Sequence, residues 1–191
     1  MIPIVLDPKA TPLALAGRGA LAGRRLEWLR AGGADSLEVY SDRPSAELAR
    51  AARGRLLDHL PDAAELARLR VLWIADLPLA DAALLATRAR EAGVLVNDED
   101  VVGWCDFHHP SVVRRGDLLL TVSTGGRSPG LAARIRRELA LRFGPEWALR
   151  LERLGAKRAA WRRRPRPLDE LARLTDAMID RRQWLRREAP R

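Results

Sequence analysis

The sequence of 191 residues has a single cysteine, only two lysines and few aromatic residues. The lone Cys105 excludes an internal disulfide framework and a cysteine-rich zinc site. No apolar run approaches the roughly 18–20 residues of a membrane-spanning helix. The N-terminus lacks a basic segment followed by a long apolar one, so we expect no signal peptide. These absences predict a cytoplasmic protein. Its length of 191 residues allows one full-sized domain, or one domain and a small appendage.

Positive charge is concentrated in the second part of the chain. Residues 1–113 carry 13 basic and 16 acidic side chains, whereas residues 114–191 carry 21 basic and 9 acidic ones, a net charge of +12. A basic half of this kind faces an anionic partner, or it reflects an arginine-rich composition without one. A nucleic acid is the weaker candidate partner, because the chain has no recognition-helix or RNP motif and only 5% aromatic residues.

Short apolar segments alternate with helical patterns through the first half. Strands are predicted at Leu13–Ala16, Leu37–Tyr40, Val71–Ala75 and Val94–Val96. Helices are predicted at Arg24–Ala31, Ala46–Arg53 and Asp81–Ala92. This alternation predicts an α/β fold, with a Rossmann-like domain built on a parallel sheet over residues 1–113.

The pattern changes after residue 113. One strand is predicted at Asp117–Ser123, followed by a glycine-containing loop that runs to Pro129. Helices are predicted at Leu131–Arg142, Glu146–Arg164 and Leu168–Leu185. We therefore expect two further regions, a loop-bearing region at 114–145 and a helical C-terminal region at 146–191.

A dinucleotide-binding motif follows the first predicted strand. Gly17-Arg-Gly19-Ala-Leu-Ala22 has the form G-x-G-x-x-A and leads into a predicted helix. In such a motif the first glycine permits a tight turn, the second lets the backbone approach a pyrophosphate, and the alanine lets helix and strand pack closely. Gly17, Gly19, Ala20, Leu21 and Ala22 are thus candidate cofactor-binding residues. The alternative is a glycine turn that binds nothing.

An acidic residue about 20 positions after the glycines completes this fingerprint. Asp42 has the expected position, and a carboxylate there would accept a hydrogen bond from the ribose 2′-hydroxyl of NAD. It would also repel the 2′-phosphate of NADP, although the neighbouring Arg43 weakens that discrimination. We predict NAD as the cofactor, with Asp42 and Arg43 in its site. The alternative is that this segment is only a turn and a helix start.

Three acidic side chains follow the fourth predicted strand, in Asn97-Asp98-Glu99-Asp100. Ligands of open α/β sheets bind beyond the carboxyl ends of strands, where a carboxylate can act as a general base. Strand alternation predicts Asp98 and Asp100 on one face and Glu99 on the other. The alternative is a solvated acidic turn.

No metal site is predicted. His108 and His109 are adjacent in an extended segment, so their side chains point in opposite directions and do not share a mononuclear metal. Cys105 is interpreted as a small buried apolar residue rather than a nucleophile.

Several motifs occur together in one order. The glycine motif at Gly17 is followed by Asn97-x-x-Asp100, by Phe107-His-His-Pro-Ser111, and by Thr121-Val-Ser-Thr-Gly-Gly-Arg-Ser-Pro129. This order resembles the precorrin-2 dehydrogenase/sirohydrochlorin ferrochelatase family, the dehydrogenase module of siroheme synthase. The resemblance extends over about residues 15–185, and its most specific segment is Pro110–Ala132.

The resemblance implies NAD-dependent oxidation of precorrin-2 to sirohydrochlorin, and in some members insertion of ferrous iron as a second substrate. It implies a homodimer in which region 114–145 serves dimerisation and substrate binding. It places the catalytic acid on Asp100, and cofactor contacts on Ala75 and Asp76. The candidate substrate-binding residues, for an anionic tetrapyrrole, are Phe107, Arg114, Arg115, Ser123, Thr124, Gly125, Gly126, Arg127 and Ser128.

The chain departs from the family pattern at three places. Arg18 occupies a position often held by glycine, Asp76-Leu77 replaces a threonine and an aspartate, and Asp98-Glu99 replaces two residues that are usually apolar. The last change leaves Asp98 as the alternative catalytic acid, and the first two favour a second interpretation, a non-catalytic NAD-binding regulatory module. No methyltransferase segment follows, so we expect methylation of the tetrapyrrole precursor to belong to another chain.

Overall fold

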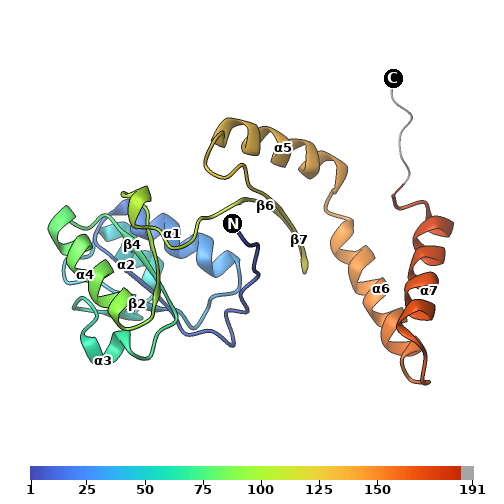
Figure 1. The fold of residues 1–191 in the computed structure, drawn as a ribbon, viewed down its shortest axis with the longest axis horizontal. Coiled ribbons are helices and arrows are strands. Elements are labelled where there is room, and N and C mark those ends of the chain that lie inside the picture. The colour runs from blue at the N-terminus through green and yellow to red at the C-terminus, as the bar shows by residue number, and fades with distance from the viewer. Residues whose placement is uncertain (186–191) are drawn as a thin grey trace. The chain divides into compact units, whose positions relative to one another are not determined.

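The computed structural model describes residues 1–185. The chain divides into two compact units, Met1–His108 and the residues from His109 onward (Figure 1). Each unit has its own arrangement of strands and helices. The three-part division expected from the sequence, with boundaries after residues 113 and 145, stays a prediction. Residues 186–191 of the expected helical region lie outside the described part.

The first unit is built on a five-stranded parallel sheet, which confirms the predicted fold class. Its strand order is β3-β2-β1-β4-β5. In that order the strands are β3 (Leu56–Leu57), β2 (Glu38–Tyr40), β1 (Leu13–Gly17), β4 (Val71–Ala75) and β5 (Leu95–Asp98). The direction of winding reverses between β1 and β4, so a crevice for ligands is expected at the carboxyl ends of these two strands.

Helices cover both faces of this sheet (Figure 1). Helices α1 (Ala20–Ala31) and α2 (Ala46–Ala52) pack on one face, and α3 (Ala63–Leu66) and α4 (Leu79–Glu91) pack on the other. Strand β1 is fully buried between these layers. A strand covered on both faces reads as a continuous apolar run, which is why the Leu-Ala-Leu-Ala segment was recognisable in the sequence.

Several element boundaries differ from the expectations. Helix α1 begins at Ala20 rather than Arg24, so the glycine loop leads directly into the helix and Gly19 is its N-cap. Strand β5 extends to Asp98, which brings that carboxylate into the strand. Strand β3 was not predicted, because two residues are too few for an alternating pattern.

The second unit begins with an antiparallel ribbon of β6 (Ser111–Arg115) and β7 (Leu118–Val122). Strand β6 was not predicted, although Gly116-Asp117 between two strand-length segments is a two-residue hairpin signal. Gly116 has a φ of 57°, which the turn requires and which glycine adopts without strain.

Three helices complete the second unit and confirm the helical C-terminal part. They are α5 (Pro129–Arg142), α6 (Trp147–Trp161) and α7 (Leu168–Arg182). Helix α6 ends at Trp161, three residues before the predicted end at Arg164. None of the helices within residues 1–185 is long and apolar enough to cross a membrane.

Candidate dinucleotide site

The glycine loop between β1 and α1 allows three backbone segments to pack closely. A Cβ atom on Gly17 would lie 2.4 Å from the carbonyl oxygen of Ala75 and 2.6 Å from the Cβ of Ala22. Any side chain at this position would therefore push β4 or α1 away from β1. The small residues of the motif are required by this packing before any ligand is considered.

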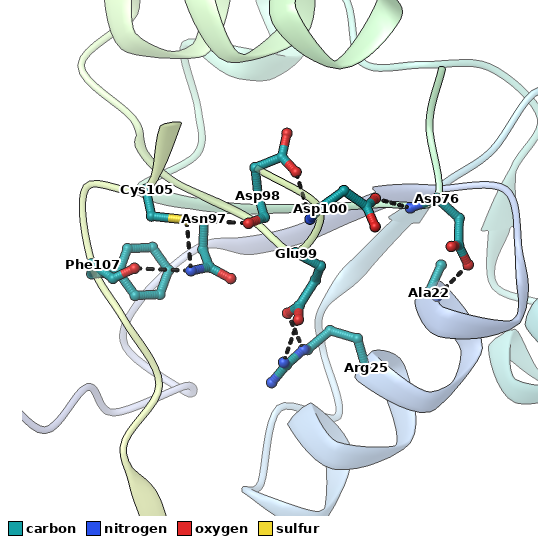
Figure 2. Close-up of polar contacts among 9 residues, drawn as sticks. All are labelled: Ala22, Arg25, Asp76, Asn97, Asp98, Glu99, Asp100, Cys105 and Phe107. Atoms are coloured by element: carbon teal, nitrogen blue, oxygen red, sulfur yellow. Dashed lines mark hydrogen bonds and ion pairs between the residues drawn. The ribbon is translucent and has the colours of Figure 1, made fainter. Parts of the chain in front are cut away.

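A carboxylate lies on the N-terminus of α1. The backbone N–H of Leu21 donates to Oδ2 of Asp76 at 2.6 Å. The N–H of Ala22 donates to the same oxygen at 3.3 Å (Figure 2). A Cβ on Gly19 would lie only 2.4 Å from the same oxygen. Asp76 has a φ of 55°, an uncommon conformation for a residue other than glycine. Sequence reasoning placed Asp76 in the cofactor site but missed this cap, which depends on a contact between distant segments.

A cavity of about 660 Å³ opens at this loop. Its lining comes from the glycine loop and α1, from the segment after β2 and from the segment after β4. The lining residues are Arg18, Gly19, Ala20, Leu21, Arg24, Arg43, Asp76, Leu77 and Pro78. Three guanidinium groups and a glycine loop at a helix N-terminus suit a ligand with a pyrophosphate.

Some of these lining residues were predicted and some were not. The structure brings together five of the expected residues, which are Gly19, Ala20, Leu21, Arg43 and Asp76. The other expected residues are not part of the lining, and these are Gly17, Ala22, Asp42 and Ala75. Arg24 was missed because the helix was expected to start there. A helix that starts at Ala20 places Arg24 one turn further along the same face.

Arg18 bridges two acidic side chains beside this cavity. Its Nε and Nη2 donate to the two carboxylate oxygens of Asp42, both at 2.7 Å, and its Nη1 donates to Oδ2 of Asp81 at 2.7 Å. The hydrogen bonds from Arg18 hold the pKa of the Asp42 carboxyl below its usual value. A ribose hydroxyl would therefore share Asp42 with Arg18, an arrangement that the motif alone does not reveal.

The three acidic side chains at the end of β5 have different surroundings. Asp98 is only 2% exposed, and its Oδ1 accepts hydrogen bonds from the N–H groups of Asp100 and Val101. Glu99 forms an ion pair with Arg25 of α1 (Figure 2). Asp98 therefore stabilises the turn that follows β5, and the ion pair of Glu99 holds this turn against α1.

Asp100 is the exposed member of the three. Its Oδ2 accepts a hydrogen bond from the backbone N–H of Asp76 at 2.9 Å. The carboxylate is thus held beside the residue that caps α1, at the carboxyl end of the sheet. Of the three acidic residues, Asp100 has the accessibility that a general base needs.

The segment after β5 is held against the sheet by Asn97 and Phe107. Asn97 Nδ2 donates to the carbonyl oxygen of Phe107 at 2.8 Å, and the Phe107 ring packs edge-on against Trp73. The thiol of Cys105 donates to the carbonyl oxygen of Asp98, and burial raises its pKa. These contacts give Phe107 a packing role, while its contact with a substrate stays a prediction.

The second glycine loop lies in the second unit, between β7 and α5. Thr124 Oγ1 accepts from the N–H of Ser128 and donates to its carbonyl oxygen, and Ser128 Oγ accepts from the N–H of Leu131. Gly125 and Gly126 have φ values of 65° and 79°. The side chains of Thr124 and Ser128 thus shape the loop, and Arg127 is exposed on it.

The three candidate arginines of the second unit do not lie together along the ribbon. Ser111 pairs with Val122 next to the loop, whereas Arg115 pairs with Leu118 beside the hairpin turn. Arg115 also donates to the carbonyl oxygens of Phe143 and Ala140, near the end of α5. Arg114 and Arg115 are therefore separated from the loop by the length of the ribbon.

Comparison with known proteins places these features in a family. Residues 4–111, more than half of the chain, match a family described as "Putative NAD(P)-binding". The chain belongs to this family. Residues 115–140 match a second family, described as "Sirohaem biosynthesis protein central". The two matches confirm the resemblance that the sequence motifs indicated.

Curated relatives and a solved structure agree with this assignment. The siroheme synthase of Methylococcus capsulatus is 33% identical over 140 residues, and that of Chromobacterium violaceum is 34% identical over 140 residues. Each alignment covers 72% of this chain, which spans about 30% of the length of these relatives. The solved structure "SirC, precorrin-2 dehydrogenase" superposes with a TM-score of 0.73 at 23% identity, over 97% of this chain and 93% of that chain. This likeness confirms the fold.

Proposed function

We propose that the chain is an NAD⁺-dependent precorrin-2 dehydrogenase of siroheme biosynthesis. The observation that carries the proposal is the order of two matched segments on one chain, an NAD(P)-binding segment followed by a sirohaem-biosynthesis segment. The reaction converts precorrin-2 and NAD⁺ to sirohydrochlorin, NADH and a proton. When bound, the nicotinamide accepts the hydride, so the protein has to position the reactants and manage a proton.

The first unit would hold the cofactor and the base. The loop Gly17–Ala22 and the arginines of the 660 Å³ cavity suit the pyrophosphate. Asp42, which is paired with the lining residue Arg18, suits the ribose. Asp100 would take up the substrate proton, since it is exposed at the carboxyl end of β5. The same carboxylate is the candidate to accept pyrrole N–H protons if ferrous iron is a second substrate.

The second unit would bind the anionic tetrapyrrole. Its residues belong to the half of the chain with a net charge of +12, which suits a substrate with many carboxylates. Exposed Arg127 on the glycine loop is the candidate first contact. Arg114 and Arg115, at the other end of the ribbon, would reach a different part of the substrate or serve the fold alone.

A second copy of the chain is the proposed partner of the second unit. In the described part of this unit the buried apolar residues are Val113, Ala132, Leu171 and Met178. A two-stranded ribbon is marginally stable without further cover. Exposed Leu131 on α5 is one of the apolar side chains that a partner would bury. Analytical ultracentrifugation should give a dimer, and a monomeric chain would contradict this part of the proposal.

An anaerobic assay with precorrin-2 and NAD⁺ tests the dehydrogenase. We expect sirohydrochlorin and NADH in equal amounts, and repetition with ferrous iron tests chelation by its chromophore change. Binding of NAD⁺ without turnover would instead support the regulatory-module interpretation. A folded Gly19→Asp variant should lose NAD⁺ binding in calorimetry, because the new side chain would fill the space that the second glycine leaves for the pyrophosphate and its carboxylate would repel that group.

A further inference from the structure

We propose that Asp76 is a built-in competitor of the dinucleotide, whose carboxylate occupies the backbone amides that would hold the pyrophosphate. The cofactor would then bind only by displacing this side chain from the N-terminus of α1. The inference rests on the dinucleotide binding of the proposed function and adds a residue that sets its affinity.

The N-terminus of α1 has no anion of its own. Its N-cap is Gly19, which has no side chain, and its first turn contains no acidic residue. A helix N-terminus favours a negative charge, because its free N–H groups and the helix dipole both attract one. Asp76 supplies that charge from the loop after β4, through hydrogen bonds from Leu21 and Ala22.

Asp76 uses both the hydrogen-bond donor and the space that a pyrophosphate needs. The single N–H of Leu21 already donates to Asp76 Oδ2 at 2.6 Å. The same oxygen lies 2.4 Å from where a Cβ of Gly19 would be, so it fills the space that the second glycine leaves open. A phosphate oxygen cannot share that position, and two anions there would repel each other.

The side chain can leave without a change in the backbone. The N–H of Asp76 is held by Asp100 Oδ2 at 2.9 Å, an interaction that does not involve its own carboxylate. Rotation about χ1 of Asp76 would clear the amides while this backbone contact persists. The free protein thus caps α1 with its own carboxylate, and the cofactor takes over the cap.

Calorimetry with NAD⁺ on four proteins tests the inference. They are the wild type, Asp76→Asn, which keeps the shape and removes the charge, Asp76→Ala, which vacates the amides, and the control Asp62→Asn. Asp62 caps α3 by accepting from the N–H of Glu65 at 2.8 Å, and it is not a lining residue of the cavity. The control therefore matches the loss of one charge at a helix cap elsewhere in the unit.

We expect the Kd for NAD⁺ to fall on the order of tenfold in Asp76→Ala, because the cofactor no longer has to break charge-assisted hydrogen bonds at the N-terminus of α1. The Kd should fall by less in Asp76→Asn, whose amide oxygen can still accept hydrogen bonds from Leu21 and Ala22. Asp62→Asn should bind like the wild type. Without NAD⁺, Asp76→Ala should melt at a lower temperature because α1 loses its cap, and saturating NAD⁺ should raise its melting temperature more than that of the wild type.

Three outcomes would overturn the inference. The first is that the wild type binds NAD⁺ and both Asp76 variants bind it equally well or more weakly. Asp76 would then contact the cofactor or have no effect on its binding, and the proposed function would be unaffected. An equal fall in the Kd for NAD⁺ in Asp62→Asn would mean that the change in net charge, and not the vacated amides of α1, causes the tighter binding. A wild type and variants that all fail to bind NAD⁺ would refute the dinucleotide part of the proposed function as well. If Asp76→Ala does not fold, Asp76→Asn decides.

Discussion

Replacing Gly17 with alanine adds one methyl group at the most crowded point of the glycine loop. The new Cβ would lie 2.4 Å from the Ala75 carbonyl oxygen and 2.6 Å from the Ala22 Cβ. Ordinary van der Waals contact begins near 3.4 Å, so both distances are too short by nearly 1 Å. The first obstacle is backbone and the second is a Cβ atom, so neither can rotate away. Strand β4 or helix α1 must move.

The cost follows from this geometry. Adding a methylene-sized group to a well-packed site costs about 1–3 kcal/mol, and two rigid obstacles place Gly17→Ala in the upper part of that range. For a chain of this size each kcal/mol lowers the melting temperature by roughly 2–4 °C. We therefore expect Gly17→Ala to lower the melting temperature of the protein by about 4–12 °C.

The assay measures the melting temperature by differential scanning calorimetry, with Gly155→Ala as the matched control. Gly155 lies within α6, and a Cβ there would meet no atom within 4 Å. Because alanine favours a helix over glycine by up to about 1 kcal/mol, the control should be unchanged or more stable. A Gly17→Ala protein that melts within about 1 °C of the wild type would refute the packing argument.

Three further predictions concern the proposed site. Asp100→Asn should lower kcat by roughly 10²–10⁴-fold with little change in NAD⁺ affinity. Asp98→Asn should keep an almost normal kcat, because its amide oxygen can still accept the hydrogen bonds that close the turn. A large loss of kcat in the Asp98 variant alone would assign the role of general base to Asp98. Arg127→Ala should raise KM for precorrin-2 more than it lowers kcat, since an exposed charge binds ground and transition states alike, and an unaltered KM at low salt would remove Arg127 from the substrate site. Arg18→Ala should free both oxygens of Asp42 and remove a cation, raising the Kd of NADP⁺ relative to that of NAD⁺ by about tenfold; calorimetry with both dinucleotides that gives an unchanged ratio would contradict this.

Most of the first unit could be predicted from the sequence. Strands β1 and β4 are short segments buried throughout between two helical layers, and such burial leaves a continuous apolar run in the sequence. Strands β2 and β5 are apolar and buried over part of their length. The motif at Gly17–Ala22 was equally recognisable, because its small residues are required by the contact between β1, β4 and α1.

The acidic loop shows where local patterns stop being sufficient. Alternation separates Glu99 from its neighbours, and Glu99 does point toward Arg25. It does not distinguish buried Asp98 from exposed Asp100, since that difference depends on which carboxylate accepts the hydrogen bonds that the backbone N–H groups of the turn donate. Likewise, Arg114 and Arg115 are close to the second glycine loop in sequence, but the hairpin places them at the opposite end of the ribbon from that loop. The sequence did not show this separation, because it did not reveal the pairing of β6 with β7.

The sequence by itself determined the parallel α/β fold, the glycine loop and the family, because each depends on residues that are neighbours in the chain or repeat at a strand or helix spacing. Only the tertiary structure decided what lies on that loop. Asp76 caps α1 across 55 positions of sequence, and Arg18 holds Asp42 across 24. Such pairings arise when a parallel sheet brings the carboxyl ends of separate strands to one edge, and they leave no periodic signal in the sequence.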